Sequence, residues 1–320
     1  MAQRFKIKKI GKIDPVKLIS GIIILTVMII GILADNGIIN IDKYKKFFDD
    51  ADTAAVDAQM SVHFIDVGQG DSTLIISDGE AMLVDAGESD CGEIVADYLD
   101  KMGVTKLKYV IGTHPHSDHI GGLSHIIRNY QVETIIMPKL PDDMVPTTMV
   151  YEKLLRTISD KKLKIRTARD ETLELGTSKV EIFKPISDTK NLNNYSVCAK
   201  ITHGDNSFLL TGDTEKTAEK DFAKKYGSKL SAKVYKMGHH GSETASSAEL
   251  LDVVNPRYAI ISCAKENDYG HPHEEAVDRI KTYADYILST YKTGTIVFES
   301  DGKGLSVIDT KGKNLLEQEN

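Results

Sequence analysis

The sequence has 320 residues, of which 41% are hydrophobic and 27% charged, values typical of a folded globular protein. Three cysteines are too few for a disulfide framework or a zinc finger, so any metal site must use histidines and carboxylates. The formal net charge of −7 is uneven: residues 1–34 carry six basic side chains and one acid, which leaves −12 on residues 35–320. A body this acidic is a poor partner for long polyanions such as nucleic acids.

The first distinct element is residues 18–34, an apolar stretch without a charged residue. As a helix it measures about 25 Å, at the short end of what spans a membrane. Basic residues precede it and Asp35 follows it, an arrangement that places residues 1–17 in the cytoplasm as a basic tail and the body outside. We therefore predict a single-pass signal anchor in the cell membrane. A cleaved signal peptide, which releases a secreted body, is the alternative.

Residues 35–59, rich in aspartate, are predicted to be a linker, and the region after it alternates apolar segments with segments of helical spacing. The predicted strands are residues 61–67, 72–77, 81–86, 106–113, 132–138, 162–168, 179–185, 196–202, 206–212, 232–237, 258–263, 286–290, 294–300 and 304–309. The predicted helices are residues 91–102, 123–130, 150–159, 214–226 (with Asp213 or Thr214 as the N-cap), 245–254 and 274–283. We expect one α/β domain at 60–310, with helices outside two packed sheets, and a tail at 311–320.

The most informative segment is residues 113–122, which read THPHSDHIGG and follow a predicted strand. The segment places four metal-binding side chains within six residues: His114, His116, Asp118 and His119. Imidazoles and carboxylates bind zinc and similar ions, and four of them on one turn can serve two metals. Gly121 and Gly122 are predicted to open a helix whose N-terminus faces the cluster and favours an anionic group.

Six segments in the same order resemble the metallo-β-lactamase superfamily. They are FIDVGQGDS at 64–72, LVDAG at 83–87, THPHSDHIGG at 113–122, LLTGD at 209–213, KMGHHGS at 236–242 and NDYGHPH at 267–273. The resemblance is greatest to the branch that includes the extracytoplasmic domain of the ComEC DNA-uptake channel and secreted phosphorylcholine esterases. It implies an αββα sandwich over about 250 residues.

The resemblance also implies a ligand set for two divalent ions around the histidine cluster. Asp213 is expected to bridge the two ions. His239 is expected to complete the first position, which leaves His240 as a catalytic side chain that either contacts substrate or supports the metal-binding residues. His271 is expected to complete the second position, with His240 and His273 as substitutes. No histidine stands between the first cluster and the bridging aspartate, where many superfamily members have one, so the fourth ligand of the first position is the least defined.

Two further aspartates lie in segments that match the family. Asp85 is expected to support the histidine loop by hydrogen bonding rather than to bind metal. Asp66 and Asp71 flank a Gly-Gln-Gly turn, and both a structural role and a substrate contact are open for them.

The implied chemistry is metal-assisted hydrolysis with Zn²⁺ as the expected ion and Mn²⁺ or iron as alternatives. Asp118 is expected to bind metal and to orient the attacking water, while His240 or His271 stabilises charge or protonates the leaving group. We expect a membrane-anchored extracytoplasmic phosphoesterase that acts on small or cell-envelope phosphoesters. The alternatives are a nuclease that acts on DNA during uptake, which the charge of the body disfavours, and a non-catalytic metal-bound DNA-uptake module.

Overall fold

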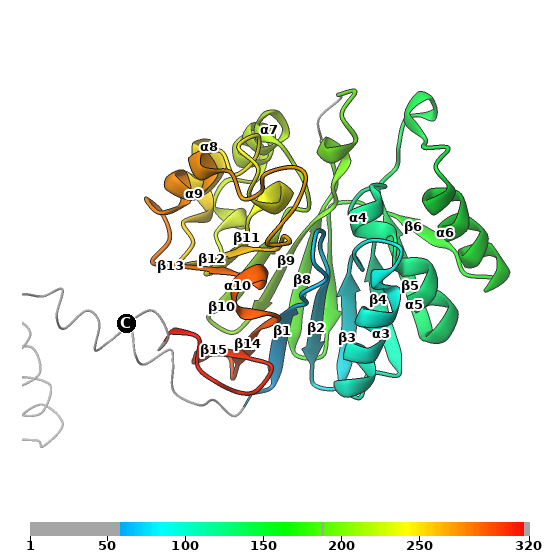
Figure 1. Ribbon diagram of the computed structural model, residues 1–320, viewed down its shortest axis with the longest axis horizontal. Coiled ribbons are helices and arrows are strands. Elements are labelled where there is room, and N and C mark those ends of the chain that lie inside the picture. The colour runs from blue at the N-terminus through cyan, green and yellow to red at the C-terminus, as the bar shows by residue number, and fades with distance from the viewer. Residues whose placement is uncertain (1–57, 187–188, 317–320) are drawn as a thin grey trace, which may run out of the picture. The chain divides into compact units, whose positions relative to one another are not determined.

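Two β-sheets packed face to face form the centre of the computed structural model, which describes residues 58–186 and 189–316 (Figure 1). The predicted basic tail, signal anchor and nearly all of the linker lie outside these residues. Among the described residues, no helix has the length and apolar character needed to cross a membrane.

The first sheet has eight strands in the order β15-β14-β1-β2-β3-β4-β5-β6. Its strands are β1 (Met60–Phe64), β2 (Thr73–Ser77), β3 (Glu80–Val84), β4 (Lys106–Ile111), β5 (Gln131–Met137), β6 (Ile165–Thr167), β14 (Ile296–Ser300) and β15 (Leu305–Asp309). Strands β3 to β6 run parallel to one another, and the other neighbours are antiparallel.

The second sheet has seven strands in the order β13-β12-β11-β10-β9-β8-β7. Its strands are β7 (Glu171–Leu175), β8 (Ser178–Phe183), β9 (Cys198–His203), β10 (Asn206–Leu210), β11 (Val234–Lys236), β12 (Tyr258–Ile261) and β13 (Tyr286–Ser289). Strands β10 to β13 are parallel, so each sheet has a parallel half whose strands end at one edge.

Helices cover the outer face of each sheet, which gives four layers (Figure 1). The helices are α3 (Cys91–Lys101), α4 (Ser117–Ile120), α5 (Leu123–Asn129), α6 (Met149–Asp160), α7 (Lys216–Tyr226), α8 (Ala248–Val254), α9 (Glu274–Ile280) and α10 (Thr290–Thr293). One buried apolar cluster lies between the sheets, a second joins the first sheet to α3, α5 and α6, and a third joins the second sheet to α7, α8 and α9. The predicted αββα sandwich is therefore confirmed.

The differences from the predicted elements are local. Strand β7 was not expected, because ETLEL carries two glutamates and only two apolar residues, which are the ones it buries. Helix α7 begins at Lys216 with Glu215 as its N-cap, so neither Asp213 nor Thr214 caps it. In the stretch predicted as a tail, Leu315 is 2% exposed and packs into the cluster between the sheets.

The glycine pair after the histidine cluster serves close packing of the backbone. A Cβ on Gly122 would lie 2.3 Å from the carbonyl oxygen of Ala86, and one on Gly121 would lie 2.4 Å from the amide nitrogen of Ser89. The glycines therefore allow the histidine loop to lie against the loop after β3.

Helix α7 is tied to the start of α8 by one buried carboxylate. Glu219 is 0% exposed and accepts hydrogen bonds from the backbone N–H groups of Ser246 and Ser247, at 2.7 and 2.6 Å. Burial raises the pKa of Glu219 from 4.5 to about 7, although these two hydrogen bonds act in the opposite direction.

This raised pKa predicts a loss of stability as the pH increases. Since the unfolded chain ionises near pH 4.5 and the folded chain near pH 7, the free energy of unfolding falls between these values by about 3 kcal/mol. Glu219→Gln removes the ionisation, so its unfolding free energy relative to wild type should rise by that amount from pH 5 to pH 8. Urea unfolding with a chelator present measures this difference. Glu249→Gln, at an exposed glutamate on α8, is the control, and a rise of equal size there contradicts the assignment.

Candidate metal centre

The chemistry-bearing residues lie where the parallel strands of both sheets end. Asp85 directly follows β3, His114 follows β4, Asp213 follows β10, and His239 and His240 follow β11. The carboxyl ends of parallel strands meet at one edge of a sheet, and here the two edges face each other. Residues far apart in the sequence therefore come together in one cluster.

Asp213 is the centre of this cluster and is 1% exposed. Its Oδ1 lies 3.2 Å from Nε2 of His119. Its Oδ2 faces three other imidazoles, at 3.8 Å from Nε2 of His114, 3.8 Å from Nε2 of His239 and 3.5 Å from Nε2 of His240. The two oxygens of one carboxylate thus face different sets of histidines.

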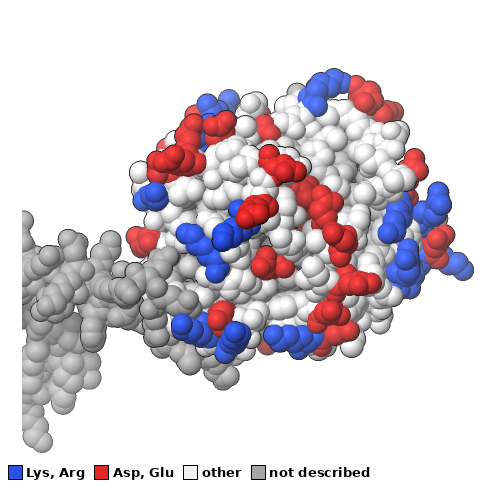
Figure 2. Space-filling view, viewed as in Figure 1, with Lys and Arg blue, Asp and Glu red and all other residues white. Residues whose placement is uncertain are grey.

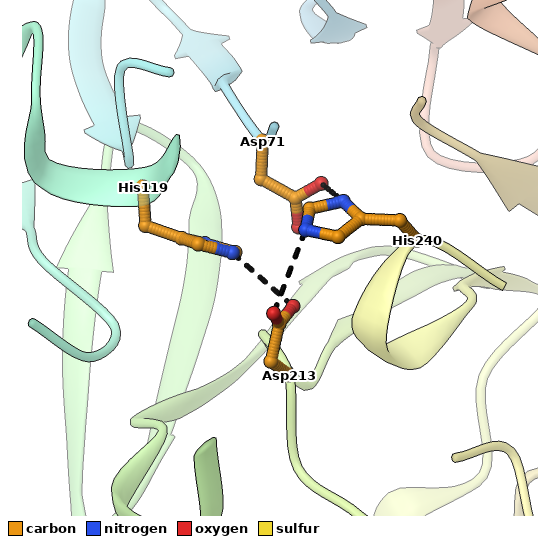
Figure 3. A group of neighbouring side chains, drawn as sticks. All are labelled: Asp71, His119, Asp213 and His240. Atoms are coloured by element: carbon orange, nitrogen blue, oxygen red, sulfur yellow. Dashed lines mark ion pairs between the residues drawn. The ribbon is translucent and has the colours of Figure 1, made fainter. Parts of the chain in front are cut away.

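Four residues offer ligand atoms that all lie within 4.8 Å of one another: Asp71, His119, Asp213 and His240. Figure 3 shows His119 and His240 on either side of Asp213, with Asp71 against the His240 ring. Nε2 of His119 and Oδ1 of Asp213 are buried and have no hydrogen-bond partner. Buried polar atoms without partners are costly, and imidazole nitrogens beside a carboxylate suit a divalent cation, so this donor set fits a metal ion.

His119 is held by the aspartate that the sequence assigned to a supporting role. Oδ2 of Asp85 lies 2.8 Å from Nδ1 of His119, and Asp85 also accepts hydrogen bonds from the backbone N–H and hydroxyl of Thr113, at 2.8 and 2.7 Å. A carboxylate acceptor places the ring proton on Nδ1 and leaves Nε2 to face Asp213.

The other members of the first motif stand beside this ring. Nε2 of His114 lies 3.0 Å from Nδ1 of His116. Nδ1 of His114 lies 3.2 Å from the hydroxyl of Thr113 and 3.3 Å from the hydroxyl of Ser196. Ser196 also accepts the backbone N–H of Asp213 at 3.0 Å. It was missed in the sequence, where this stretch is notable only for lacking a histidine.

His239 and His240 both have left-handed backbone conformations, with φ values of 50° and 55°. Non-glycine residues rarely adopt this region, and such strain concentrates at functional sites. The turn sends both rings toward Oδ2 of Asp213 while keeping their centroids 6.0 Å apart. Nε2 of His240 also lies 3.1 Å from Oδ2 of Asp118.

His271 lies at the mouth of the cluster rather than in the group of four. Its ring centroid is 5.4 Å from that of His239 and 6.0 Å from that of His240, and the exposed ring of Tyr269 stacks on it at 5.6 Å. Its Nδ1 is buried without a hydrogen-bond partner. Burial, together with the charge of His240, lowers the pKa of His271 to about 4. His273 is turned away, with Nε2 3.0 Å from the carbonyl oxygen of Tyr269.

The charges of the cluster shift one another's ionisation. Burial favours the neutral form of Asp213, but the charges of His119 and His240 outweigh it and hold the pKa of Asp213 well below its usual value. Burial alone would lower the pKa of His119. The negative charges of Asp213 and Asp118 have the larger effect, and they raise this pKa well above its usual value. His114, further from the carboxylates, has its pKa lowered by burial and by the charge of His119.

A cleft of about 370 Å³ opens over the cluster. Its wall includes His116, Asp118, Asp213, His239, His240 and His271, together with Gln69, Asn193 and Tyr269. Two of these other residues hold buried polar atoms without a hydrogen-bond partner, Nε2 of Gln69 and Oδ1 of Asn193. The cleft is large enough for a small ester group to reach the cluster.

Comparisons with known proteins show similarities over most of the described residues. A family model described as "Metallo-beta-lactamase superfamily" matches residues 65–265. Similar curated proteins include "ComE operon protein 3" of Bacillus subtilis, 28% identical over 261 residues that cover 74% of this chain and 32% of that protein. "Recombination protein 2" of Haemophilus influenzae is 32% identical over 241 residues, which cover 73% of this chain and 28% of that protein.

The chain therefore spans about a third of the length of the curated relatives that it matches. Among solved structures, Igni18, described as a metallo hydrolase from Ignicoccus hospitalis, matches with a TM-score of 0.49 and 16% identity, over 75% of this chain and 100% of that one.

Proposed function

Because this chain belongs to the metallo-β-lactamase superfamily, we propose that it is a metal-dependent phosphoester hydrolase with two divalent ions. The observation that carries the proposal is the central place of Asp213. Its Oδ1 faces His119 and its Oδ2 faces His114, His239 and His240, so each oxygen has imidazole neighbours of its own, as a carboxylate shared by two ions requires.

We assign the ligands to two positions on either side of this carboxylate. The first position has His114, His116 and His239, and the second has Asp118, His119 and His240. His240 is preferred to His271 for the second position, because its Nε2 is 3.1 Å from Asp118 whereas His271 stands at the mouth. Zn²⁺ is the expected ion, since the proposed set consists of imidazoles and carboxylates.

Bound there, two divalent ions would lower the pKa of a water molecule and clamp the attacked phosphoryl group. The chain's own side chains supply the remaining functions. Asp118 orients the attacking water, since one of its oxygens faces the second position and the residue lines the cleft. His271 faces the cleft, and because its pKa is lowered to about 4 it is a neutral imidazole that can hydrogen-bond to the substrate.

The acidic surface supports a small or cell-envelope phosphoester as the substrate. Figure 2 shows acidic side chains in a band across the face it presents, with basic side chains in smaller groups on both sides of the band. Such a surface lacks the broad basic patch that holds nucleic acid tightly. The anchor predicted at residues 18–34 would place the site outside the cytoplasm, near the cell envelope.

A nuclease is the second candidate, and one surface feature favours it. A groove of about 490 Å³ on α6 adjoins the cleft at Val150 and contains Lys153 and Arg156, which suit the phosphates of a longer strand. One relative of similar coverage is named "Competence protein ComA", from Neisseria gonorrhoeae, 27% identical over 77% of this chain and 33% of that protein.

A substrate panel tests the proposal on the full chain purified from the membrane fraction and loaded with Zn²⁺ or Mn²⁺. We expect hydrolysis of small phosphodiesters and phosphocholine esters that a chelator abolishes, with a much lower kcat/KM for single-stranded DNA. Efficient DNA cleavage that falls steeply with salt, and that Lys153→Gln weakens, would favour the nuclease. If a chain that holds two ions hydrolyses no phosphoester, the protein is a non-catalytic metal-bound module and the proposed function is wrong. Recovery of a shortened soluble chain supports a cleaved signal peptide instead of the anchor.

A further inference from the structure

A buried lysine ends the strand that leads into the histidine pair. Lys236, the last residue of β11, is 2% exposed, and its Nζ lies 2.8 Å from Oδ2 of Asp71, which is 6% exposed. Nζ also donates a hydrogen bond to the carbonyl oxygen of Met237 at 2.9 Å. Lysine is almost never fully buried unless it is paired, and burying an ion pair costs desolvation free energy, so a role for this pair must be sought.

The other oxygen of Asp71 faces His240. Oδ1 lies 3.2 Å from Nδ1 of His240, the same nitrogen that lies 3.0 Å from the carbonyl oxygen of Ser262 at the end of β12. A carbonyl oxygen only accepts, so Nδ1 donates a proton to it, and Nε2 is the nitrogen that a metal ion would bind. Nε2 is the nitrogen that faces Asp118 and Asp213. Asp71 therefore faces Nδ1 of the ring, while one of its oxygens also lies within 4.8 Å of ligand atoms of His119 and Asp213.

A related arrangement is present at the other histidine of the second position. Nδ1 of His119 is hydrogen-bonded to Asp85, whereas Nδ1 of His240 is hydrogen-bonded to Ser262 and lies 3.2 Å from Oδ1 of Asp71. The two carboxylates differ in what holds them: Asp85 accepts two hydrogen bonds from Thr113, while Asp71 is paired with the Lys236 ammonium group. A carboxylate behind a metal-binding histidine fixes the orientation of the ring, and its loss typically weakens metal binding about 10–100-fold.

The loop that carries Asp71 is fastened to the metal-facing segment. The backbone N–H of Asp71 donates to the carbonyl oxygen of Asp118 at 3.0 Å, and its carbonyl oxygen accepts from Gly87 at 2.9 Å. Asp71 thereby links the loop between β1 and β2 to both the Asp118 segment and the His240 turn. This gives the loop FIDVGQGDS a physical role that its sequence left open.

We propose that the buried pair Lys236–Asp71 is a positioning device that holds the His240 ring for the second metal ion. The inference rests on the function proposed above, because it assumes that His240 binds the second ion. Asp71 sets the ring through its Nδ1, and Lys236 fixes Asp71. Neither residue touches the substrate.

Stepwise Zn²⁺ affinities of the full chain, measured by chelator competition, test the proposal. Lys236→Met and Asp71→Asn should weaken the second ion about 10–100-fold and leave the first within about threefold of wild type. Lys236→Arg retains the cation and should restore most of the affinity. The matched control is Lys233→Met, which removes a partly buried lysine that contacts Asn206 instead of the cluster and should bind as wild type does. His119→Ala should weaken binding of the second ion and His116→Ala binding of the first, so these two variants show how the loss of each ion appears in the measurement.

A double variant separates positioning from folding. Lys236→Met with Asp71→Leu removes both buried charges, a change that is often neutral or stabilising, so the metal-free chain should keep its Tm. Its second ion should still bind weakly, because nothing orients the ring. Wild-type affinity for the second ion in this variant would overturn the proposal, and so would equal losses at both positions.

Hydrolysis is measured separately on the same proteins. A wild-type chain that binds two ions and hydrolyses no phosphoester overturns the proposed function alone. A chain that binds no second ion overturns the positioning role as well.

Discussion

Asp213→Ala is expected to lower kcat/KM for phosphoester hydrolysis by at least about 10³-fold, a loss of roughly 4 kcal/mol in transition-state stabilisation. Both oxygens of this carboxylate face histidines, Oδ1 toward His119 and Oδ2 toward His114, His239 and His240. If this side chain serves both positions, as proposed, its removal should lower the occupancy of both ions, unlike the loss of any histidine. Metal analysis and steady-state kinetics on the same preparations measure the two effects.

Two further aspartate substitutions show whether the loss of activity in Asp213→Ala comes from the loss of the carboxylate charge. Asp213→Asn keeps the shape of the side chain but removes its charge, and it should bind both ions weakly while the metal-free chain keeps its Tm. Asp205→Asn, at an exposed aspartate in the turn between β9 and β10, should behave as wild type. If Asp213→Ala depletes only one ion, the carboxylate does not bridge, and the assignment of two positions around it is wrong.

The candidate site could be predicted from the sequence where its residues are contiguous. His114, His116, Asp118 and His119 lie within six residues, so their spacing alone brings them to one turn after β4. Asp213 has no such neighbours in the chain and was assigned only through the family motif. The structure places it among these residues because β4 and β10 end at facing edges of two sheets.

The choice between His240 and His271 could not be made from the sequence. Adjacent residues on a loop point in directions that depend on their backbone angles, and His239 and His240 both have positive φ values that no propensity predicts. That conformation turns both rings toward Asp213 instead of sending one away. Their assignment to metal positions stays a prediction.

Lys236 and Asp71 were missed as a pair for a different reason. Lysine at the end of a predicted strand normally reaches solvent, and an aspartate after a Gly-x-Gly turn commonly supports the turn itself. Only the packing of β11 against the loop between β1 and β2 brings the two charges together. Such long-range pairing carries no local pattern, in contrast to the alternating apolar segments that predicted most of the strands.

Gly70→Ala is expected to destabilise the chain by about 3 kcal/mol and to weaken the second metal position, whereas Gly68→Ala in the same turn should cost only about 1 kcal/mol. Both glycines have positive φ values, 132° and 71°, so both substitutions strain the backbone. The two positions differ in the room available for a side chain. A Cβ on Gly70 would lie 2.4 Å from the carbonyl oxygen of Asp118, whereas a Cβ on Gly68 would have no atom within 4 Å.

The clash at Gly70 falls on the contact that fastens this loop to the metal-facing segment. The carbonyl oxygen of Asp118 accepts the backbone N–H of Asp71, so pushing it aside moves Asp118 and Asp71 together. We therefore expect Gly70→Ala to reduce affinity for the second Zn²⁺ ion far more than for the first, whereas Gly68→Ala leaves both affinities near wild type. Urea unfolding and chelator competition on the two variants measure the difference. Equal effects of the two substitutions would mean that backbone strain, and not the approach to Asp118, explains why glycine stands at position 70.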